Sequence, residues 1–475
     1  MRVLLTGATG YIGKRLLSVL VEQGCEVVCC VRDKNRFNPD EKYRKNIEAV
    51  EVDFLKEDTL KNIPKDIDAA YYLIHSMASH KDFKSLEEKA ANNFISSLKG
   101  SSCKQTIYLS GIVNEEELSE HLASRKEVEN ILSKGDFHLT TFRAGIVIGS
   151  GSASFEIIRD LVEKLPIMVA PKWLRTNCQP IGIRDVLKFL SKGLLNEKVY
   201  DAAYDIGSPD VLTYKEMLLG YAECRGLKRR IFIVPVMTPK LSSYWLYFIT
   251  STSYKLATSL VDSMKVEVVC SPSDINQRLD IKPAGYKEAL DFTLKAVDSN
   301  KTVSSWKDAL TSSDFEKRLS DFSEIPKQGC FIDKREREYD DKEKTIEKIW
   351  AIGGKTGWYY LNWLWKIRGF LDKLVGGVGL RRGRTHPSNI SVGDALDFWR
   401  VLYADKSECK LILFAEMKLP GEAWLEFKLE GGRVIQTATF RPKGLKGRLY
   451  WYAVWPFHGF IFKGMLKRIA SSKKS

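Results

Sequence analysis

The sequence lacks the patterns by which disulfide-rich, metal-binding and membrane-spanning proteins are identified. Its nine cysteines are scattered, with no Cys-x-x-Cys pair and no Cys/His set at zinc spacing. Neither a disulfide framework nor a metal site is therefore expected, and a reducing compartment fits. No uninterrupted apolar run reaches ~18 residues, so we predict no transmembrane segment. The first strand pattern begins at residue 2, which leaves no room for a secretory signal and favours a cytoplasmic protein.

Length and charge suggest more than one domain and an uneven surface. A chain of 475 residues is too long for one ordinary core,. Between Asp321 and Ser475, 29 Lys and Arg face 18 Asp and Glu, which gives +11 of the total +14. Such a basic, Trp-rich region is compatible with peripheral contact to an anionic membrane, with an acidic ligand, or simply with a solvated surface over an aromatic core. No reader motif accompanies the basic residues, so nucleic acid is not expected.

The first 150 residues alternate short apolar runs with amphipathic stretches, which is typical of a parallel α/β sheet. We expect strands at 2–6, 26–32, 47–53, 68–76, 104–111 and 138–145, with helices at 11–24 and 84–99. This order predicts a Rossmann-type, doubly wound parallel sheet. A mixed α/β pattern, with a helix at 238–264, continues to about residue 300. Residues 1–300 are therefore assigned to one Rossmann-type domain with a second lobe at about 150–300.

The pattern changes class after a Ser- and charge-rich stretch at 301–328, which we interpret as a linker. Residues 409–442 predict three strands joined by turns at Pro420-Gly421 and Gly431-Gly432,. A long amphipathic helix is expected at 447–474. Antiparallel strands and one long helix make 329–475 a separate α+β domain.

The strongest motif is "TGATGYIG", which follows the first strand and opens the first helix. Gly7 allows a sharp turn, Gly10 allows the backbone to approach a pyrophosphate, and Gly13 allows the helix to pack against the sheet,. A merely tight strand-to-helix turn is the alternative. The strand before and the helix after favour dinucleotide binding. We therefore assign residues 1–300 to an NAD(P)-binding domain, in which the lobe at about 150–300 is the substrate lobe.

Two residues at later strand ends are candidates for further contacts with the dinucleotide. Arg32 ends the second strand, about 20 residues past the glycines, where an arginine pairs with a 2′-phosphate and favours NADP(H) over NAD(H),. A surface arginine is the competing interpretation. Asp53 ends the third strand, where it would either meet the adenine edge or cap its own loop.

Four segments together resemble the atypical short-chain dehydrogenase/reductase superfamily in its NmrA-like branch, over roughly residues 1–300. They are "TGATGYIG", the strand ending in "YLSG", "FRAGIVIGSGS" and "QPIGIRDV". The segments "GWYYLNWLWKIRGFLDKLVGGVGLRRGR", "EMKLPGEAWLEF" and "GRLYWYAVWPFHGFIF" resemble a domain of unknown function that bacterial homologues carry behind such a Rossmann domain. That domain is similar to the START-like helix-grip fold, a curved sheet around a long C-terminal helix that often encloses an apolar ligand.

The resemblance implies a set of site residues. Those matching the dinucleotide turn are Gly7, Thr9, Gly10, Tyr11, Ile12 and Gly13, and those lying along the cofactor's ribose are Leu73, Ile74 and His75. Ser110 falls where the superfamily has its catalytic Ser or Thr. His121 and Arg125 fall on the Tyr-x-x-x-Lys positions, with Ser124 and Glu129 keeping the rest of that helix's pattern.

The departure from Tyr and Lys leaves two functions open. His121 titrates near neutral pH and can act as a general acid, whereas Arg125 can hold a ribose or phosphate but cannot give up its proton. One hypothesis is an NADP(H)-dependent oxidoreductase acting on a hydrophobic carbonyl, quinone or lipid-like substrate. The alternative is a non-catalytic NADP(H)-binding redox sensor or assembly factor with a ligand- or partner-binding C-terminal domain. Oligomeric state does not follow from the sequence.

Aromatic residues of the C-terminal domain are either its core or the wall of an apolar cavity with arginines at its mouth. The residues in question are Trp358, Tyr359, Tyr360, Trp363 and Trp365, followed by Arg368, Arg381, Arg382 and Arg384. Glu416 is a candidate for a carboxylate that points into such a cavity.

Overall fold

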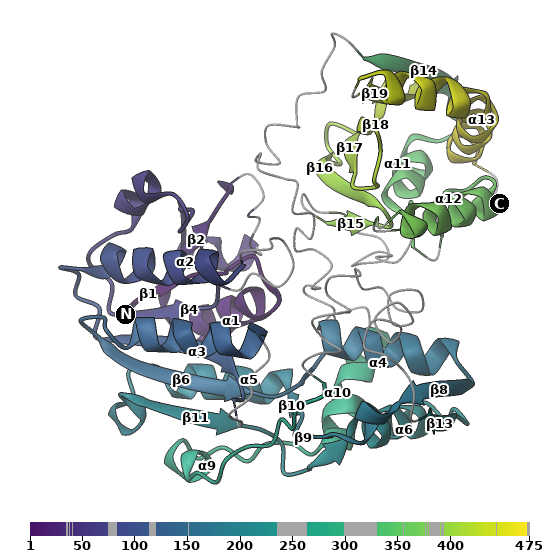
Figure 1. Cartoon of the computed structure of the whole chain (residues 1–475). Helices are drawn as coiled ribbons and strands as arrows, with labels where there is room; N and C mark the ends of the chain where they lie inside the picture. Colours follow the sequence, from purple (N-terminus) through teal and green to yellow (C-terminus); the bar gives the residue numbers. More distant parts are fainter. Residues whose placement is uncertain are drawn as a thin grey trace. The chain divides into compact units, whose positions relative to one another are not determined.

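The computed structural model describes residues 1–34, 37, 39, 41–74, 83–113, 120–150, 152–234, 264–298, 330–354, 356–375, 377, 379, 390, 394–442 and 444–472. The chain divides into two compact units, Met1–Asp314 and Phe315–Ser475 (Figure 1). Nearly all of the helix predicted at 238–264, the whole linker predicted at 301–328, and the three arginines at 381, 382 and 384 lie outside the described residues.

The first unit is built on a seven-stranded sheet in the order β11-β6-β5-β4-β1-β2-β3, parallel in every pair. Its strands are β1 (Arg2–Leu5), β2 (Glu26–Val31), β3 (Ile47–Glu51), β4 (Ala69–Tyr72), β5 (Gln105–Gly111), β6 (His138–Ala144) and β11 (Ala202–Ile206). The chain order reverses between β1 and β4, which is where such sheets bind nucleotides. The predicted Rossmann-type fold is confirmed.

Helices cover both faces of this sheet, which explains why its strands read as continuous apolar runs. The helices are α1 (Tyr11–Glu22), α2 (Phe83–Leu98), α3 (Glu120–Leu132), α5 (Ile183–Lys192) and α9 (Ile275–Arg278), whereas α10 (Tyr286–Asp298) packs in the smaller core described below. Val3 and Leu5 pack with α1 and α5, whereas Leu4 packs with α2 and α3 on the opposite face. Side chains of successive residues in one strand thus pack into two separate hydrophobic cores, one on each face of the sheet.

A smaller layer in the second half of this unit has a core of its own. Its elements are β7 (Val147–Ile148), α4 (Ala153–Lys164), β8 (Ile167–Pro171), β9 (Asn177–Cys178), β10 (Ile181–Gly182), β12 (Leu212–Thr213), α6 (Tyr214–Cys224) and β13 (Arg230–Val234). Short 3-10 helices lie at Glu41–Asn46, Glu57–Asn62, Lys172–Arg175 and Glu197–Val199. Helix α6 begins with a capping box between Thr213 and Glu216, which fixes its start,.

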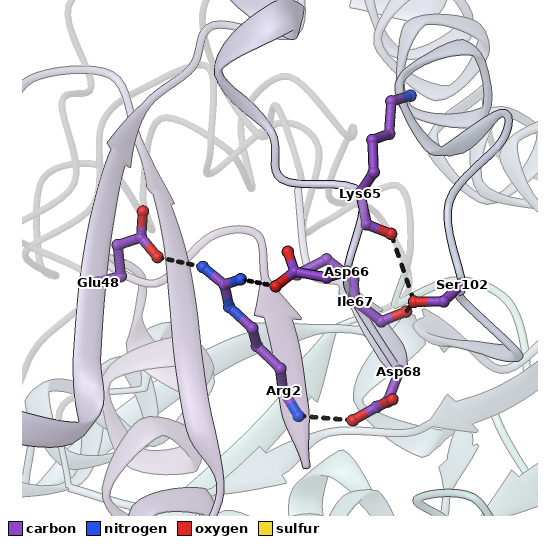
Figure 2. Close-up of polar contacts among 7 residues, drawn as sticks. All are labelled: Arg2, Glu48, Lys65, Asp66, Ile67, Asp68 and Ser102. Carbon is purple, nitrogen blue, oxygen red and sulfur yellow. Dashed lines mark hydrogen bonds and ion pairs between the residues drawn. The ribbon is translucent and has the colours of Figure 1, made fainter.

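At the amino-terminal ends of the strands, which form one edge of the large sheet, Arg2 of β1 connects β1 to neighbouring segments of the sheet (Figure 2). The guanidinium of Arg2 lies between Glu48 and Asp66, and its backbone N–H donates to Asp68 at 2.7 Å. Because the Arg2 side chain is 26% exposed, these ion pairs hold the edge in register more than they add stability. This edge lies opposite the carboxyl ends of the strands, so it leaves the candidate site unobstructed.

The second unit is an antiparallel sheet in the order β14-β19-β18-β17-β16-β15 with three helices. Its elements are β14 (Phe331–Glu338), α11 (Lys342–Trp350), α12 (Asn362–Leu374), β15 (Ala395–Leu396), β16 (Trp399–Asp405), β17 (Lys410–Ala415), β18 (Gly421–Glu430), β19 (Arg433–Pro442) and α13 (Gly444–Ala470). The α+β class and the three-strand meander are confirmed, and Gly431 and Gly432 turn at positive φ as the hairpin requires,. Strands β14, β15 and β16 were not predicted. In the part of the chain described here, every helix is too short or too polar to cross a membrane.

A buried ion pair crosses two strands of this sheet. Arg400 Nη2 and Nε each donate to a carboxylate oxygen of Glu416 at 3.1 Å, and both side chains are fully buried. The expectation that Glu416 points into a cavity is therefore wrong, because Arg400 occupies its carboxylate. A buried charge that loses its partner is strongly destabilising.

We predict that Glu416→Ala lowers the free energy of unfolding of the second unit by roughly 3–5 kcal/mol, because Arg400 would stay buried without its carboxylate. Chemical denaturation followed by Trp fluorescence measures this. Glu430→Ala, which removes an exposed ion pair with Lys428, should cost less than about 1 kcal/mol. Equal effects of the two changes would contradict the prediction.

Candidate functional site

The glycine turn is closed so tightly that two of its residues must be glycine. Gly7 adopts φ +65°, and a Cβ on it would lie 2.6 Å from the carbonyl oxygen of Leu73. A Cβ on Gly13 would lie 2.2 Å from the carbonyl oxygen of Gly7. Helix α1 therefore packs directly on the turn, and the turn packs on the end of β4.

Thr6 locks this turn onto β4. Its N–H and its hydroxyl both donate to the Tyr71 carbonyl, at 3.1 and 2.9 Å, and its hydroxyl accepts from the Leu73 N–H at 2.9 Å. Leu73 and Ile74 follow β4 as half-buried residues, beside the turn. His75 lies outside the described residues. These hydrogen bonds of Thr6 could not be predicted from the sequence, in which Thr6 is notable only for its place before the first glycine.

The first turn of α1 fits a negatively charged pyrophosphate. The helix begins at Tyr11, and Gly10 before it offers no side-chain cap to the first N–H groups,. Thr9 is exposed beside them, and Ile12 is half-buried. Burial of the Tyr11 hydroxyl raises its pKa to about 12, so it stays protonated. The open N–H groups and the glycine cradle thus suit a dinucleotide.

Arg32 and Asp53, which are expected to contact the dinucleotide beyond the glycine turn, differ in how free their side chains are. Arg32 is exposed immediately after β2, with its side chain available to a ligand. Asp53 Oδ1 accepts the Leu55 N–H at 3.1 Å, and its own N–H donates to Thr59 at 3.0 Å. Asp53 therefore caps its own loop, and a contact with adenine stays a prediction.

Ser110 lies near the carboxyl end of β5, next to β4 in the sheet. It is 2% exposed. Its hydroxyl has no well-aligned hydrogen-bond partner within the described residues, but the Tyr108 side chain of the same strand interacts with it. Arg125 of α3 reaches the same strand end, since a Cβ on Gly111 would lie 3.8 Å from Arg125 Nη1. His121 belongs to the first turn of α3, but its side chain lies outside the description.

Helix α3 is anchored by two contacts that hold it against its neighbours. Ser124 donates to Glu87 of α2 at 2.5 Å. Arg143 of β6, in register with Ser110, binds Glu129 through two hydrogen bonds of 3.0 and 2.6 Å. Burial alone would lower the pKa of Arg143, but the Glu129 carboxylate outweighs it and raises that pKa. Sequence reasoning gave Arg143 no role, because its partner depends on the sheet register.

A cavity of about 310 Å³ lies inside the second unit, between α12, α13 and the sheet. Residues lining it include Trp365, Arg368, Trp399, Trp424, Phe440, Tyr450, Trp451, His458 and Phe462. Burial, and then the positive charge of Arg368, lowers the pKa of His458 to about 4, so the ring is neutral at pH 7. Trp358 instead belongs to the core, with its indole N–H bound to Asp397 at 2.9 Å. Both interpretations of the aromatic segment thus hold for different residues.

Comparison with protein families identifies both parts of the chain. Residues 7–148 match the NAD(P)H-binding family, and residues 326–465 match a protein family of unknown function, DUF2867. The predicted NAD(P)H-binding domain is confirmed, as is a C-terminal domain of unknown function, whereas its START-like fold stays a prediction.

Several known proteins are similar to part of this chain. The divinyl chlorophyllide a 8-vinyl-reductase of Arabidopsis thaliana is 23% identical over 226 residues, which are 44% of this chain and 54% of that protein. The chain thus spans about half the length of this curated relative. The triphenylmethane reductase of Citrobacter sp. is 16% identical with a TM-score of 0.51, over 62% of this chain and 100% of that one. A nucleoside-diphosphate-sugar epimerase of Staphylococcus aureus is 15% identical with a TM-score of 0.50, over 61% and 99%.

We predict that Gly13→Ala weakens binding of NADPH roughly tenfold or more, because the new methyl group must displace the backbone of Gly7,. Energy transfer from Trp to the nicotinamide during titration measures the affinity. Gly24→Asn is the matched control, since Gly24 also has positive φ but its Cβ would meet nothing within 4 Å. Unchanged binding by Gly13→Ala would mean that the turn does not hold the cofactor.

Proposed function

We propose that this chain is an NADP(H)-dependent oxidoreductase that acts on a hydrophobic carbonyl, quinone or lipid-like substrate. The cofactor supplies or accepts a hydride when bound. Gly7, Gly10 and Gly13 admit its pyrophosphate to the first turn of α1. Ser110 donates a hydrogen bond to the substrate oxygen, and His121 delivers the proton to that oxygen.

The observation that carries this proposal is the Ser110 hydroxyl. It is buried near a strand end in a nucleotide-binding sheet, and among the described residues it has no well-aligned hydrogen-bond partner, only a weaker interaction with Tyr108. An unsatisfied buried hydroxyl is costly unless a ligand completes it. Arg125 nearby adds positive charge that favours a ribose or phosphate oxygen. These features fit a reaction at the carboxyl ends of β4 and β5.

The cavity of the second unit supports the apolar substrate class, and a relative supports the reaction type. Aromatic and aliphatic side chains dominate the cavity wall, as in sites for apolar ligands. We assign the unit a START-like fold, because one strand and two helices precede five antiparallel strands and a long final helix. The similar plant protein is named a reductase of divinyl chlorophyllide a, which supports reduction as the reaction type.

NADP(H) is the proposed cofactor because Arg32 is exposed after β2. We predict that Arg32→Ala weakens NADPH binding roughly 10- to 100-fold, the worth of a charge-assisted hydrogen bond to the 2′-phosphate. NADH binding should change less than about twofold, since it has no such phosphate. Parallel titrations measure both, with Lys34→Ala as the control for a neighbouring exposed charge. Equal losses for both nucleotides would contradict a role in phosphate recognition.

A redox sensor without turnover is the second candidate, and Arg125 favours it. An arginine at the position of the usual lysine keeps its proton at all relevant pH values. It can bind a cofactor oxygen but cannot take part in proton transfer. In this alternative, binding of a partner depends on whether the cofactor is oxidised or reduced.

Turnover separates the two candidates. We predict that Ser110→Ala slows oxidation of bound NADPH by naphthoquinones or long-chain aldehydes on the order of 10²-fold, since it removes a donor to the developing oxyanion. NADPH affinity should stay within about twofold. Ser133→Ala, an exposed serine just after α3, is the control and should have no effect. If the unaltered protein binds NADPH tightly but oxidises it with none of these compounds, the sensor is favoured.

A further inference from the structure

Helix α12 carries an apolar stripe on its exposed side. Trp363, Ile367, Phe370 and Leu374 follow one another at intervals of four, three and four residues, so they share one face of the helix. Their exposed fractions are 57%, 47%, 54% and 56%. Exposed apolar stripes of this size mark contact sites rather than ordinary surface.

Helix α13 carries a matching stripe that ends in lysines. Leu449, Tyr452 and Phe460 are 63%, 65% and 74% exposed, and the intervals of three and four residues continue through Pro456 to Lys463 and Lys467. The helix contains five Lys and Arg and no Asp or Glu over its 27 residues. Exposed apolar side chains together with lysines and no carboxylates are the two features that attract a helix to an anionic membrane interface, here placed one after the other along a single face.

The mouth of the cavity opens onto these same helices. Ile367, Leu371 and Phe457 line the cavity and are also 47%, 55% and 58% exposed. The apolar wall of the cavity therefore continues onto the outer surface without a polar rim at these three positions. A ligand that leaves the cavity there meets apolar side chains before water.

We propose that the exposed stripes of α12 and α13, here called the α12–α13 face, dock onto an anionic lipid bilayer. The apolar side chains enter the headgroup boundary, while the lysines of α13 pair with lipid phosphates. The charge of α13 favours an anionic bilayer as the binding partner, because an interface with anionic lipid requires cations and tolerates few carboxylates. The mouth of the cavity then faces the lipid. This inference goes beyond the proposed function and does not depend on cofactor binding.

The experiment is co-sedimentation of the full chain with vesicles of phosphatidylcholine alone or with phosphatidylglycerol. We expect binding to the anionic vesicles, with weaker binding at high salt. Lys463→Gln with Lys467→Gln should weaken it on the order of 30-fold, about fivefold per lysine. Leu449→Gln with Phe460→Gln should weaken it at least tenfold, since buried apolar area is lost. NADPH binding should stay unchanged in both variants.

Control variants remove two lysines, or reduce two apolar side chains, on other exposed surfaces. Lys334→Gln with Lys428→Gln changes two lysines of the sheet, and Ile332→Thr with Ile167→Thr changes two exposed residues of strands. Neither control should alter vesicle binding. The proposal is overturned if anionic vesicles bind nothing, or if the controls and the face variants weaken binding equally. It is also overturned if the face variants instead dissociate a dimer in light scattering, which would make the face a contact between copies.

Discussion

The contact on which the first unit depends is the packing of helix α1 against the glycine turn. Because Gly13 has no side chain, the helix comes within reach of the Gly7 backbone, and Gly7 in turn meets Leu73 at the end of β4. Three elements are thus fixed at the point where strand order reverses,. The N–H groups of α1 and the end of β5 owe their relative positions to this contact. A larger residue at either glycine would separate the nucleotide turn from the strands that carry Ser110.

The first unit was largely predictable because its signals are local. Continuous apolar runs gave six strands to within a few residues, and the glycine spacing gave the turn. Pairing was less accessible: that β11 joins the sheet beside β6 depends on contacts such as Tyr204 with Phe142. Ser110 came from a family resemblance, but the unsatisfied state of its hydroxyl depends on every neighbour in space. That Asp53 caps its own loop follows from hydrogen bonds that only the structure shows.

The second unit shows why buried charge is hard to predict from sequence. Arg400 and Glu416 are 16 residues apart and meet only because β16 and β17 pair in one register. Asp333 and Arg335 likewise pair at 2.9 Å on β14, a strand that the sequence did not suggest. The unit therefore keeps some of its charges in matched internal pairs, while α13 leaves its lysines outside. Part of the excess positive charge that was visible in the composition lies on this helix, which carries five Lys and Arg and no Asp or Glu.

Pro456 divides α13 into two halves, of which the second buries more side chains in the core than the first. It has no N–H to donate to the carbonyl of Tyr452, so the helix loses a hydrogen bond in its middle,. Beyond it, Phe462, Met465, Leu466 and Ile469 are buried in the core. Before it, Trp451 is the one large side chain that is buried among those whose burial is described, and it stacks between Phe331 and Phe440. The first half therefore frays at a lower free energy than the second. The cavity wall is thus made partly of a segment that can open while the remaining core stays folded.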